Sequence, residues 1–275
     1  MSLHPDPRSA VSDYHEFPAP PRLASNIICL WTQTIAPSQS QYTHRVLPDG
    51  CADIVLSDTN PPVVVGPWTD PFDVRFTGGT SIVGARLHPG RVPGLLGLPA
   101  SELLNRSVLL DDLWSRSKTA RFARILDERH PAARRSLLAV ALDEVLRAAF
   151  PSDEAVAAGI RWLGRRAHGT IDQLSRRLGM SSRQLQRRFN TAVGYGPKTL
   201  QSVLRFQRLL SYAGTLGRPP LADLAVLAGY ADQAHMTREV RRFSGCLPTL
   251  LFQSKSCTLR LSDLFKTVGA PKVYL

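Results

Sequence analysis

The spacing of hydrophobic residues divides the chain into two parts of different character. From residue 23 to about residue 108, short runs rich in β-branched and aromatic residues alternate with Gly and Pro, which is typical of strands joined by turns. Beyond that point, hydrophobic residues recur three and four positions apart, which predicts amphipathic helices. The pattern predicts a multidomain protein, with an N-terminal α+β (mostly β) domain and a C-terminal all-α domain.

The first part begins with a polar, Pro-rich stretch, residues 1–22, that we expect to be a loosely held arm. Residues 23–35 predict a strand. The segment HRVLPDGCADIVLS, residues 44–57, predicts a β-hairpin, because Gly50 can adopt a positive φ in the turn. A helix is expected near Ala100.

The segment 113–151 is predicted as a helical linker between the N-terminal α+β domain, 1–112, and a helical domain, 152–254. Pro131 interrupts its helical pattern. After Pro131, Leu138, Leu142 and Val145 share one face of a helix over 132–150. That face could form a dimer contact, but packing against the β domain is favoured, because any surface helix needs one apolar face.

Seven helices are predicted after residue 152: 153–167, 171–178, 182–192, 197–213, 221–228, 232–243 and a short helix from Pro248. The long helix 197–213 carries Leu200, Val203, Leu204 and Leu210 on one face. It is expected to set the distance between the helical segments on either side of it.

Residues 170–197 and 220–248 read as one module written twice. Leu174 corresponds to Leu224 and Gly179 to Gly229, and one residue is inserted after Gly229. Each copy is a short apolar helix, a turn at a Gly and a second, Arg-rich helix, which is the helix-turn-helix pattern. The second helix of this motif enters the major groove of DNA, so two different half-sites are expected.

The outward residues of the two Arg-rich helices are the candidate DNA contacts, since Arg can bridge O6 and N7 of guanine and Gln can bridge N6 and N7 of adenine. Residues near the start of such a helix usually meet bases, and later ones usually meet phosphates. The candidates for bases are Arg183, Gln186, Arg187, Gln233, Ala234, His235 and Arg238. The candidates for phosphates are Ser182, Arg188, Thr237, Arg241 and Arg242.

The charge distribution supports this interpretation. The net charge of the whole chain is +12, but residues 1–151 contribute nothing to it, because they hold 15 basic and 15 acidic residues. Residues 152–254 hold 15 basic and 6 acidic residues, and residues 255–275, a basic C-terminal tail, hold 4 and 1. A neutral domain joined to a basic one suggests a sensing or assembly domain attached to a domain that binds a polyanion.

Residues 153–254 resemble the double helix-turn-helix domain of the AraC/XylS family of bacterial transcriptional regulators. The resemblance rests on DQLSRRLGMSSRQLQRRF, on LADLAVLAGYADQAHMTREVRRFSG and on Pro248. It implies sequence-specific DNA binding and control of transcription initiation, often as an activator in contact with RNA polymerase. The N-terminal half is similar to regulatory domains of unassigned function in the same family, which implies an effector or assembly role. A small-molecule effector and a homodimer are both possible partners, and no ligand is named.

The sequence gives little support for a metal site or a catalytic function. His44, Cys51 and His88 match no closed metal pattern, and no catalytic motif is present, so neither a cofactor, a metal nor an enzyme is expected. A DNA-repair methyltransferase fusion is the alternative function, but it would need a clustered Cys site or a further catalytic domain. Arg45, Asp49 and Asp53 could face a pocket, although stabilising a turn is the favoured role. The sequence shows no signal peptide and no apolar segment long enough to span a membrane, which predicts a cytoplasmic protein without membrane contact.

Overall fold

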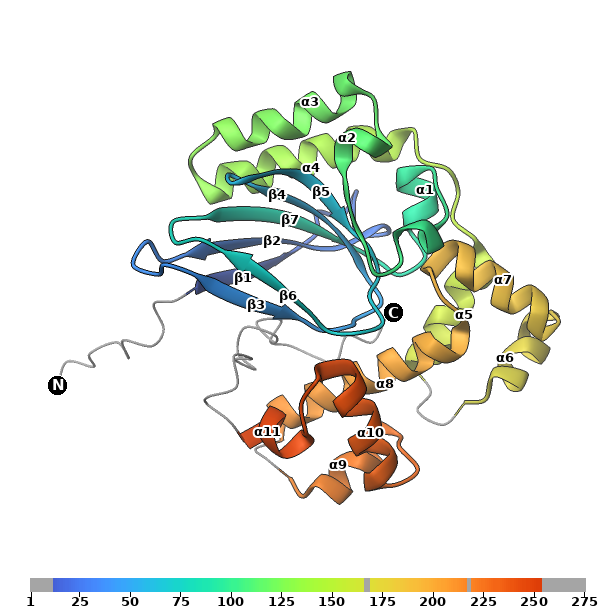
Figure 1. Cartoon of the computed structure of the whole chain (residues 1–275). Helices are drawn as coiled ribbons and strands as arrows, with labels where there is room; N and C mark the ends of the chain where they lie inside the picture. Colours follow the sequence, from blue (N-terminus) through green and yellow to red (C-terminus); the bar gives the residue numbers. More distant parts are fainter. Residues whose placement is uncertain (1–11, 166–168, 217–218, 254–275) are drawn as a thin grey trace.

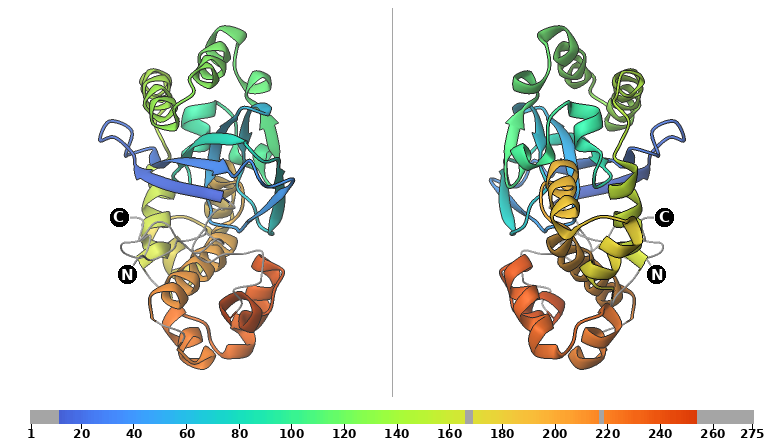
Figure 2. Two further views of the ribbon diagram at one scale, coloured as in Figure 1. Left: turned by 90° about the vertical axis from the view of Figure 1, so that its left-hand side faces the viewer. Right: turned by 90° about the vertical axis from the view of Figure 1, so that its right-hand side faces the viewer.

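The computed structural model describes residues 12–165, 169–216 and 219–253. Figures 1 and 2 show three levels: helices α3 and α4 at one end, β-sheets in the middle, and the C-terminal helices at the other end. The mostly-β N-terminal domain and the all-helical C-terminal domain predicted from the sequence are confirmed.

In the described part of the chain, eight strands form two antiparallel sheets. A six-stranded sheet has the order β1-β2-β7-β4-β5-β8, and a two-stranded sheet pairs β3 with β6. The strands are β1 (Ser12–Pro18), β2 (Ile27–Ile35), β3 (Tyr42–Val46), β4 (Ala52–Ser57), β5 (Asn60–Val65), β6 (Phe72–Phe76), β7 (Ser81–Leu87) and β8 (Ser107–Leu109).

Alternation along β4 assigns the two faces of the large sheet. Ala52, Ile54 and Leu56 join the hydrophobic core beneath the helices, while Asp53 and Val55 point to the opposite side. On that opposite side the indole of Trp31 lies directly over Gly84 of β7. A Cβ atom at Gly84 would come 2.3 Å from this ring, so only Gly fits.

The helical elements of the first half cover one face of this sheet. They are α1 (Val92–Leu96), η2 (Ala100–Leu103), α2 (Leu110–Leu113), α3 (Arg116–Arg124), η3 (Ile125–Asp127) and α4 (Pro131–Arg147). Phe122 of α3 and Leu138 and Leu142 of α4 are fully buried in the same core as the strands. The packing role favoured for the 132–150 helix is therefore confirmed.

This packing favours a later boundary between the first and second domains than the sequence suggested. The segment 113–151 was expected to be a helical linker, but α3 and α4 complete the core of the sheet instead of joining two separate bodies. We therefore propose that the first domain extends from residue 12 to about residue 148, and that the connection is the short stretch 148–153.

Two expectations for the strands are wrong. Residues 44–57 do not form a hairpin: β3 pairs with β6, whereas β4 pairs with β5 and β7. The turn at residues 48–50 exists, with Gly50 at φ +85 and Cys51 N donating to Asp49 Oδ1, but it carries the chain from one sheet to the other. The predicted arm, 1–22, contains β1, an edge strand of the large sheet; residues 1–11 lie outside the described residues.

Between residues 154 and 253, the described part of the chain forms seven helices, as the sequence predicts. They are α5 (Glu154–Arg165), α6 (Ile171–Leu178), α7 (Ser182–Val193), α8 (Pro197–Thr215), α9 (Leu221–Ala228), α10 (Gln233–Ser244) and α11 (Pro248–Gln253). The basic tail, 255–275, lies outside the described residues.

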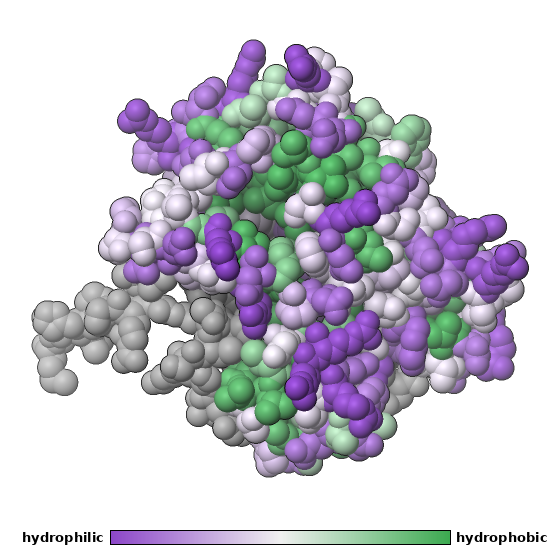
Figure 3. All heavy atoms as spheres, viewed as in Figure 1, coloured by the Kyte–Doolittle hydropathy of each residue, from purple (hydrophilic) through white to green (hydrophobic). Residues whose placement is uncertain are grey.

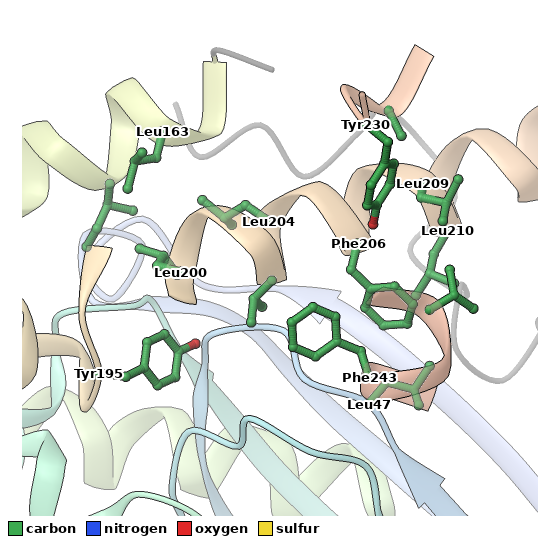
Figure 4. Packing of buried hydrophobic residues seen from close by; sticks show 14 of the residues in the cluster. Leu47, Leu163, Tyr195, Leu200, Leu204, Phe206, Leu209, Leu210, Tyr230 and Phe243 are labelled. Atoms are coloured by element: carbon green, nitrogen blue, oxygen red, sulfur yellow. The ribbon is translucent and has the colours of Figure 1, made fainter. Parts of the chain in front are cut away.

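Helix α8 forms the axis of the C-terminal half, with α6 and α7 near one end and α9 to α11 near the other (Figure 1). The predicted apolar face of α8, from Leu200 to Leu210, is buried in one cluster that both helix pairs share. Figure 4 shows this row of side chains along α8, with Phe206 beside Phe243 at ring centroids 5.4 Å apart.

The two halves of the molecule are in direct contact. Leu47, from the segment between β3 and β4, joins the hydrophobic cluster around α8. Gln207 Nε2 of α8 donates to the Pro48 carbonyl at 2.7 Å. Just before the start of α8, Gly194 lies so close to Pro67 that an added Cβ would come 2.8 Å from its ring.

Candidate DNA-binding surface

The first helix-turn-helix is built from local hydrogen bonds and two buried side chains. Thr170 and Ser181 form capping boxes at the starts of α6 and α7, each with the Gln three residues later. Gly179 ends α6 in the left-handed conformation, at φ +64. Leu174 and Leu185 are buried between the two helices, which fixes the angle at which α7 is presented.

The outer face of α7 carries the side chains expected to read bases. Arg183, Gln186 and Arg187 are exposed, and they border a shallow hollow with Asn190. Gln186 Nε2 donates to Asn190 Oδ1 at 3.0 Å, which orients the Gln amide along the helix. Ser182, expected at a phosphate, is also exposed, at the first turn of α7.

Arg188 differs from these neighbours because it already has a partner. Its Nε and Nη2 atoms donate to the two carboxylate oxygens of Asp153 at 2.6 and 2.7 Å. Asp153 Oδ1 also accepts from Val156 N at the start of α5. Burial raises the pKa of Asp153, but the hydrogen bonds from Arg188 and the helix N–H groups outweigh it and lower the pKa below its usual value. This bidentate pair ties α7 to α5 and does not leave Arg188 directed at a phosphate.

The second helix-turn-helix repeats the construction with a longer turn. Gly229 ends α9 at φ +90, and Asp232 caps α10 by accepting from His235 N at 2.6 Å. Three residues separate Gly229 from Gln233, the first residue of α10, whereas two separate Gly179 from Ser182. The inserted residue therefore lies in the turn, as the sequence indicates.

Five predicted contacts of α10 are exposed, namely Gln233, Ala234, Arg238, Arg241 and Arg242. The hydroxyl of Thr237, expected at a phosphate, donates to the Gln233 carbonyl at 2.8 Å within the helix. Together with α7, helix α10 gives the chain two separate basic helical faces.

His235 is only half exposed, because it packs toward α8. Its Nε2 atom lies 3.5 Å from Arg205 Nη1 and 3.6 Å from Glu239 Oε1, and its ring meets Tyr230 edge-on at 5.3 Å between centroids. Ser202 of α8 donates to Glu239 at 2.7 Å, which extends this contact.

Sequence reasoning missed the polar residues of α8 that hold the second motif. Arg205 is buried, with its guanidinium carbon 5.2 Å from the Tyr230 ring. Arg208 donates to the Ala228 carbonyl at 3.2 Å and to the Gly164 carbonyl at 3.0 Å, so it caps the C-terminal ends of α9 and α5 together. Their spacing in α8 could have suggested a polar face, but not the partners.

Comparison with known proteins agrees with this geometry. Residues 174–254 match the family described as "Helix-turn-helix domain", and residues 15–109 match a "Domain of unknown function (DUF6597)". Residues 174–254 form an AraC-type helix-turn-helix domain. The protein that carries this AraC-type domain is a DNA-binding transcription regulator.

Solved structures with a similar arrangement include ToxT from Vibrio cholerae. One ToxT structure has a TM-score of 0.39 at 9% identity and covers 86% of this chain and 96% of ToxT. A second has a TM-score of 0.39 at 11% identity and covers 86% and 95%. A third, described as bound to an unsaturated fatty acid, has a TM-score of 0.36 at 9% identity and covers 87% and 90%. No curated protein matches the chain.

Several alternatives find no support. Within residues 12–165, 169–216 and 219–253, no group of three or more His, Cys, Asp or Glu side chains could hold a metal ion. None of the described helices is long and apolar enough to cross a membrane. Neither of the two family descriptions names a methyltransferase.

Proposed function

We propose that α7 and α10 of one chain read two different half-sites in successive major-groove faces of DNA. The observation that carries the proposal is that both helices present exposed Arg and Gln residues while their apolar faces are packed on one rigid helix, α8. With 19 residues and a rise of about 1.5 Å per residue, α8 spans roughly 28 Å, close to one turn of B-DNA at about 34 Å.

The base-reading set we propose is Arg183, Gln186, Arg187, Gln233, Ala234 and Arg238. Ser182, Arg241 and Arg242 are proposed phosphate contacts. The packing of His235 against Tyr230 and Arg205 favours a positioning role at the start of α10. Arg188 and Thr237 are assigned to internal bonds.

The control of transcription initiation implies further partners. We propose RNA polymerase as a protein partner and a small-molecule effector bound by the N-terminal domain. A second copy of the chain would find exposed hydrophobic side chains on α4, at Leu137 and Val140. The protein would act in the cytoplasm, without a cofactor and without enzymatic activity.

Substituting Arg187 by Ala tests the base-reading assignment. The variant should bind its operator about 1–3 kcal/mol more weakly and should tolerate any base pair at one position, because a bidentate contact to guanine is lost. The measurement is a binding titration against a library of operator variants. Arg177→Ala, which removes an exposed Arg from α6, is the matched control and should leave specificity unchanged.

An equal loss of affinity for every DNA sequence would make Arg187 a phosphate contact. Titrations at several salt concentrations complete the test, because each neutralised phosphate adds a slope of about −0.9 in log K against log salt. A flat response to salt would contradict the proposed phosphate contacts.

A further inference from the structure

A cavity of about 390 Å³ lies between the six-stranded sheet and the β3–β6 pair, and Gln207 and Leu210 of α8 line one side of it. In Figure 3 hydrophobic side chains gather around a hollow over this part of the molecule. The volume is within the range of about 300–1,000 Å³ that is usual for small-molecule sites.

The walls of this cavity are apolar and come from facing strands. Val55, Val63 and Val65 line it from the large sheet, and Val74 and Phe76 line it from β6. A small molecule that fills such a space is stabilised by about 25 cal/mol for each Å² of apolar surface removed from water.

The charged groups in the cavity already interact with one another. Arg86 Nη1 donates to Glu16 Oε1 at 2.8 Å, and Arg86 Nε lies 3.3 Å from Asp53 Oδ1 and 3.5 Å from Asp49 Oδ2. Burial alone would lower the pKa of Arg86, but Asp53 and the other acidic groups raise it well above its usual value, so the guanidinium stays charged. An anionic ligand approaching Arg86 would meet three carboxylates around this single cation.

The same carboxylates also receive neutral donors. Tyr14 donates to Glu16 at 2.7 Å, and the Trp31 indole donates to Asp53 at 2.8 Å. Such a network is held by its own hydrogen bonds, and an added charge would have to be desolvated beside it.

The polar groups that remain for a ligand are uncharged. Burial, with a smaller effect from Arg86, lowers the pKa of His44 to about 4, so its imidazole is neutral at pH 7. His44 lines the cavity, and its ring makes no hydrogen bond within the part of the chain that the structure describes. The amide nitrogens of Gln33 and Gln207 donate to Ser12 Oγ and the Pro48 carbonyl, which orients both amides at the cavity wall.

We propose that this cavity binds an uncharged, largely apolar small molecule that is hydrogen-bonded by His44. The inference deepens the proposed effector role of the N-terminal domain and rests on it for its regulatory meaning. A molecule in the cavity contacts Leu210 and Gln207, so it touches the helix that holds both DNA-reading motifs. A molecule bound in the cavity would therefore influence the position of α8 by direct contact.

The test compares three probes with one ring system and different charge: 2-naphthylmethanol, 2-naphthoate and 2-naphthylmethylammonium. Binding to the full chain is measured by calorimetry and by tryptophan fluorescence, to which Trp31 in the cavity wall contributes. We expect the alcohol to bind about tenfold or more tightly than either ion. The carboxylate would meet three acidic groups around Arg86, and the ammonium would be desolvated beside carboxylates that already accept from Arg86, Tyr14 and Trp31. Tighter binding of either ion, or no binding of any probe, overturns the proposal.

Two variants locate the site. Val63→Trp should abolish binding by filling the cavity, with thermal unfolding as the check on folding.

His44→Leu should weaken binding of the alcohol about fivefold, because a hydrogen bond is lost. It should leave the affinity for 2-methylnaphthalene, which has no polar group, unchanged. His130→Leu, at an exposed position on another face, is the control. Unchanged alcohol affinity in His44→Leu would overturn the role of His44.

Operator binding of the same preparations separates this inference from the proposed function. Protein that binds operator DNA but no naphthalene probe refutes the ligand site alone. Protein that binds the alcohol but no operator refutes the DNA-reading assignment and leaves the ligand site in place.

Discussion

At the level of single residues, an internal partner separates the arginines of α7. Arg183 and Arg187 are exposed at the proposed DNA surface, whereas the adjacent Arg188 is held by both oxygens of Asp153. Three arginines within six positions therefore lie in two different environments, because the helix turns one of them toward α5. The same distinction applies to His235, which the helix directs toward α8.

Arg188→Gln is expected to leave the salt dependence of operator binding unchanged. A true phosphate contact would reduce the slope of log K against log salt by about 0.9. Because the pair is partly exposed, its loss should cost less than about 1 kcal/mol of folding free energy. Titrations in salt and urea unfolding measure the two quantities. A slope reduced by about one unit would show that Arg188 contacts a phosphate.

The pH dependence of stability provides a second measurement on the same pair. The pKa of Asp153 is lower in the folded chain than its usual value of 3.8, so its contribution to stability is complete above that value. It is lost as the pH falls below 3.8 through the folded pKa. The difference in stability between wild type and Arg188→Gln should therefore shrink on acidification in that window.

At the level of elements, each helix proposed to read DNA, α7 and α10, is positioned by its cap. Ser181 accepts from Gln184 N at 3.2 Å, while Gln184 Oε1 accepts from Ser181 N at 3.0 Å. In the second motif Asp232 alone performs this function. The caps act where a short turn leaves the first N–H groups of the helix without partners in the helix itself.

The adjacent residues Ser181 and Ser182 make a matched pair for testing the cap. Ser181→Ala should lower the free energy of unfolding by about 1 kcal/mol, since the hydroxyl that accepts from Gln184 N is removed. Ser182→Ala should change stability by less than about 0.5 kcal/mol, because the exposed Ser182 side chain takes no part in the capping box of Ser181 and Gln184. Urea unfolding measures both, and equal losses would contradict the capping assignment.

At the level of the whole molecule, the N-terminal domain contacts α8 near its start and in its middle. Gly194, just before α8, packs on Pro67 and Ala100, and Leu47 and Pro48 contact the middle of the helix. The helix that carries the two proposed DNA-reading motifs is thus in contact with the same domain that lines the cavity. A change in that domain can be transmitted to the DNA surface by contact, without passing through a flexible linker.

Gly194→Ala and Gly179→Ala compare a contact between the halves with a turn inside one motif. Both residues have positive φ, which costs about 1–2 kcal/mol for a residue with a Cβ. Only Gly194 would also place that Cβ 2.8 Å from Pro67 and 3.1 Å from the Ala100 carbonyl, and Gly179 has open space. Gly194→Ala should therefore lower the urea midpoint further. Equal shifts would show that the halves are not packed as described.

The sequence by itself determined the helices of the C-terminal half. Their caps, turn glycines and apolar spacing are local signals, and all seven helices form where those signals lie. The exposure of Arg183, Gln186 and Arg187 followed from the same spacing, because burial of Leu185 and Phe189 turns these residues outward.

Only the tertiary structure decided which distant segments meet. The turn at 48–50 was recognisable, but the pairing of β3 with β6 depends on contacts about thirty residues apart, which no local pattern encodes. For the same reason the bond between Arg188 and Asp153, the packing of α4 on the sheet and the ion cluster around Arg86 could not be predicted. Each is a contact between segments whose spacing in the chain carries no record of their distance in space.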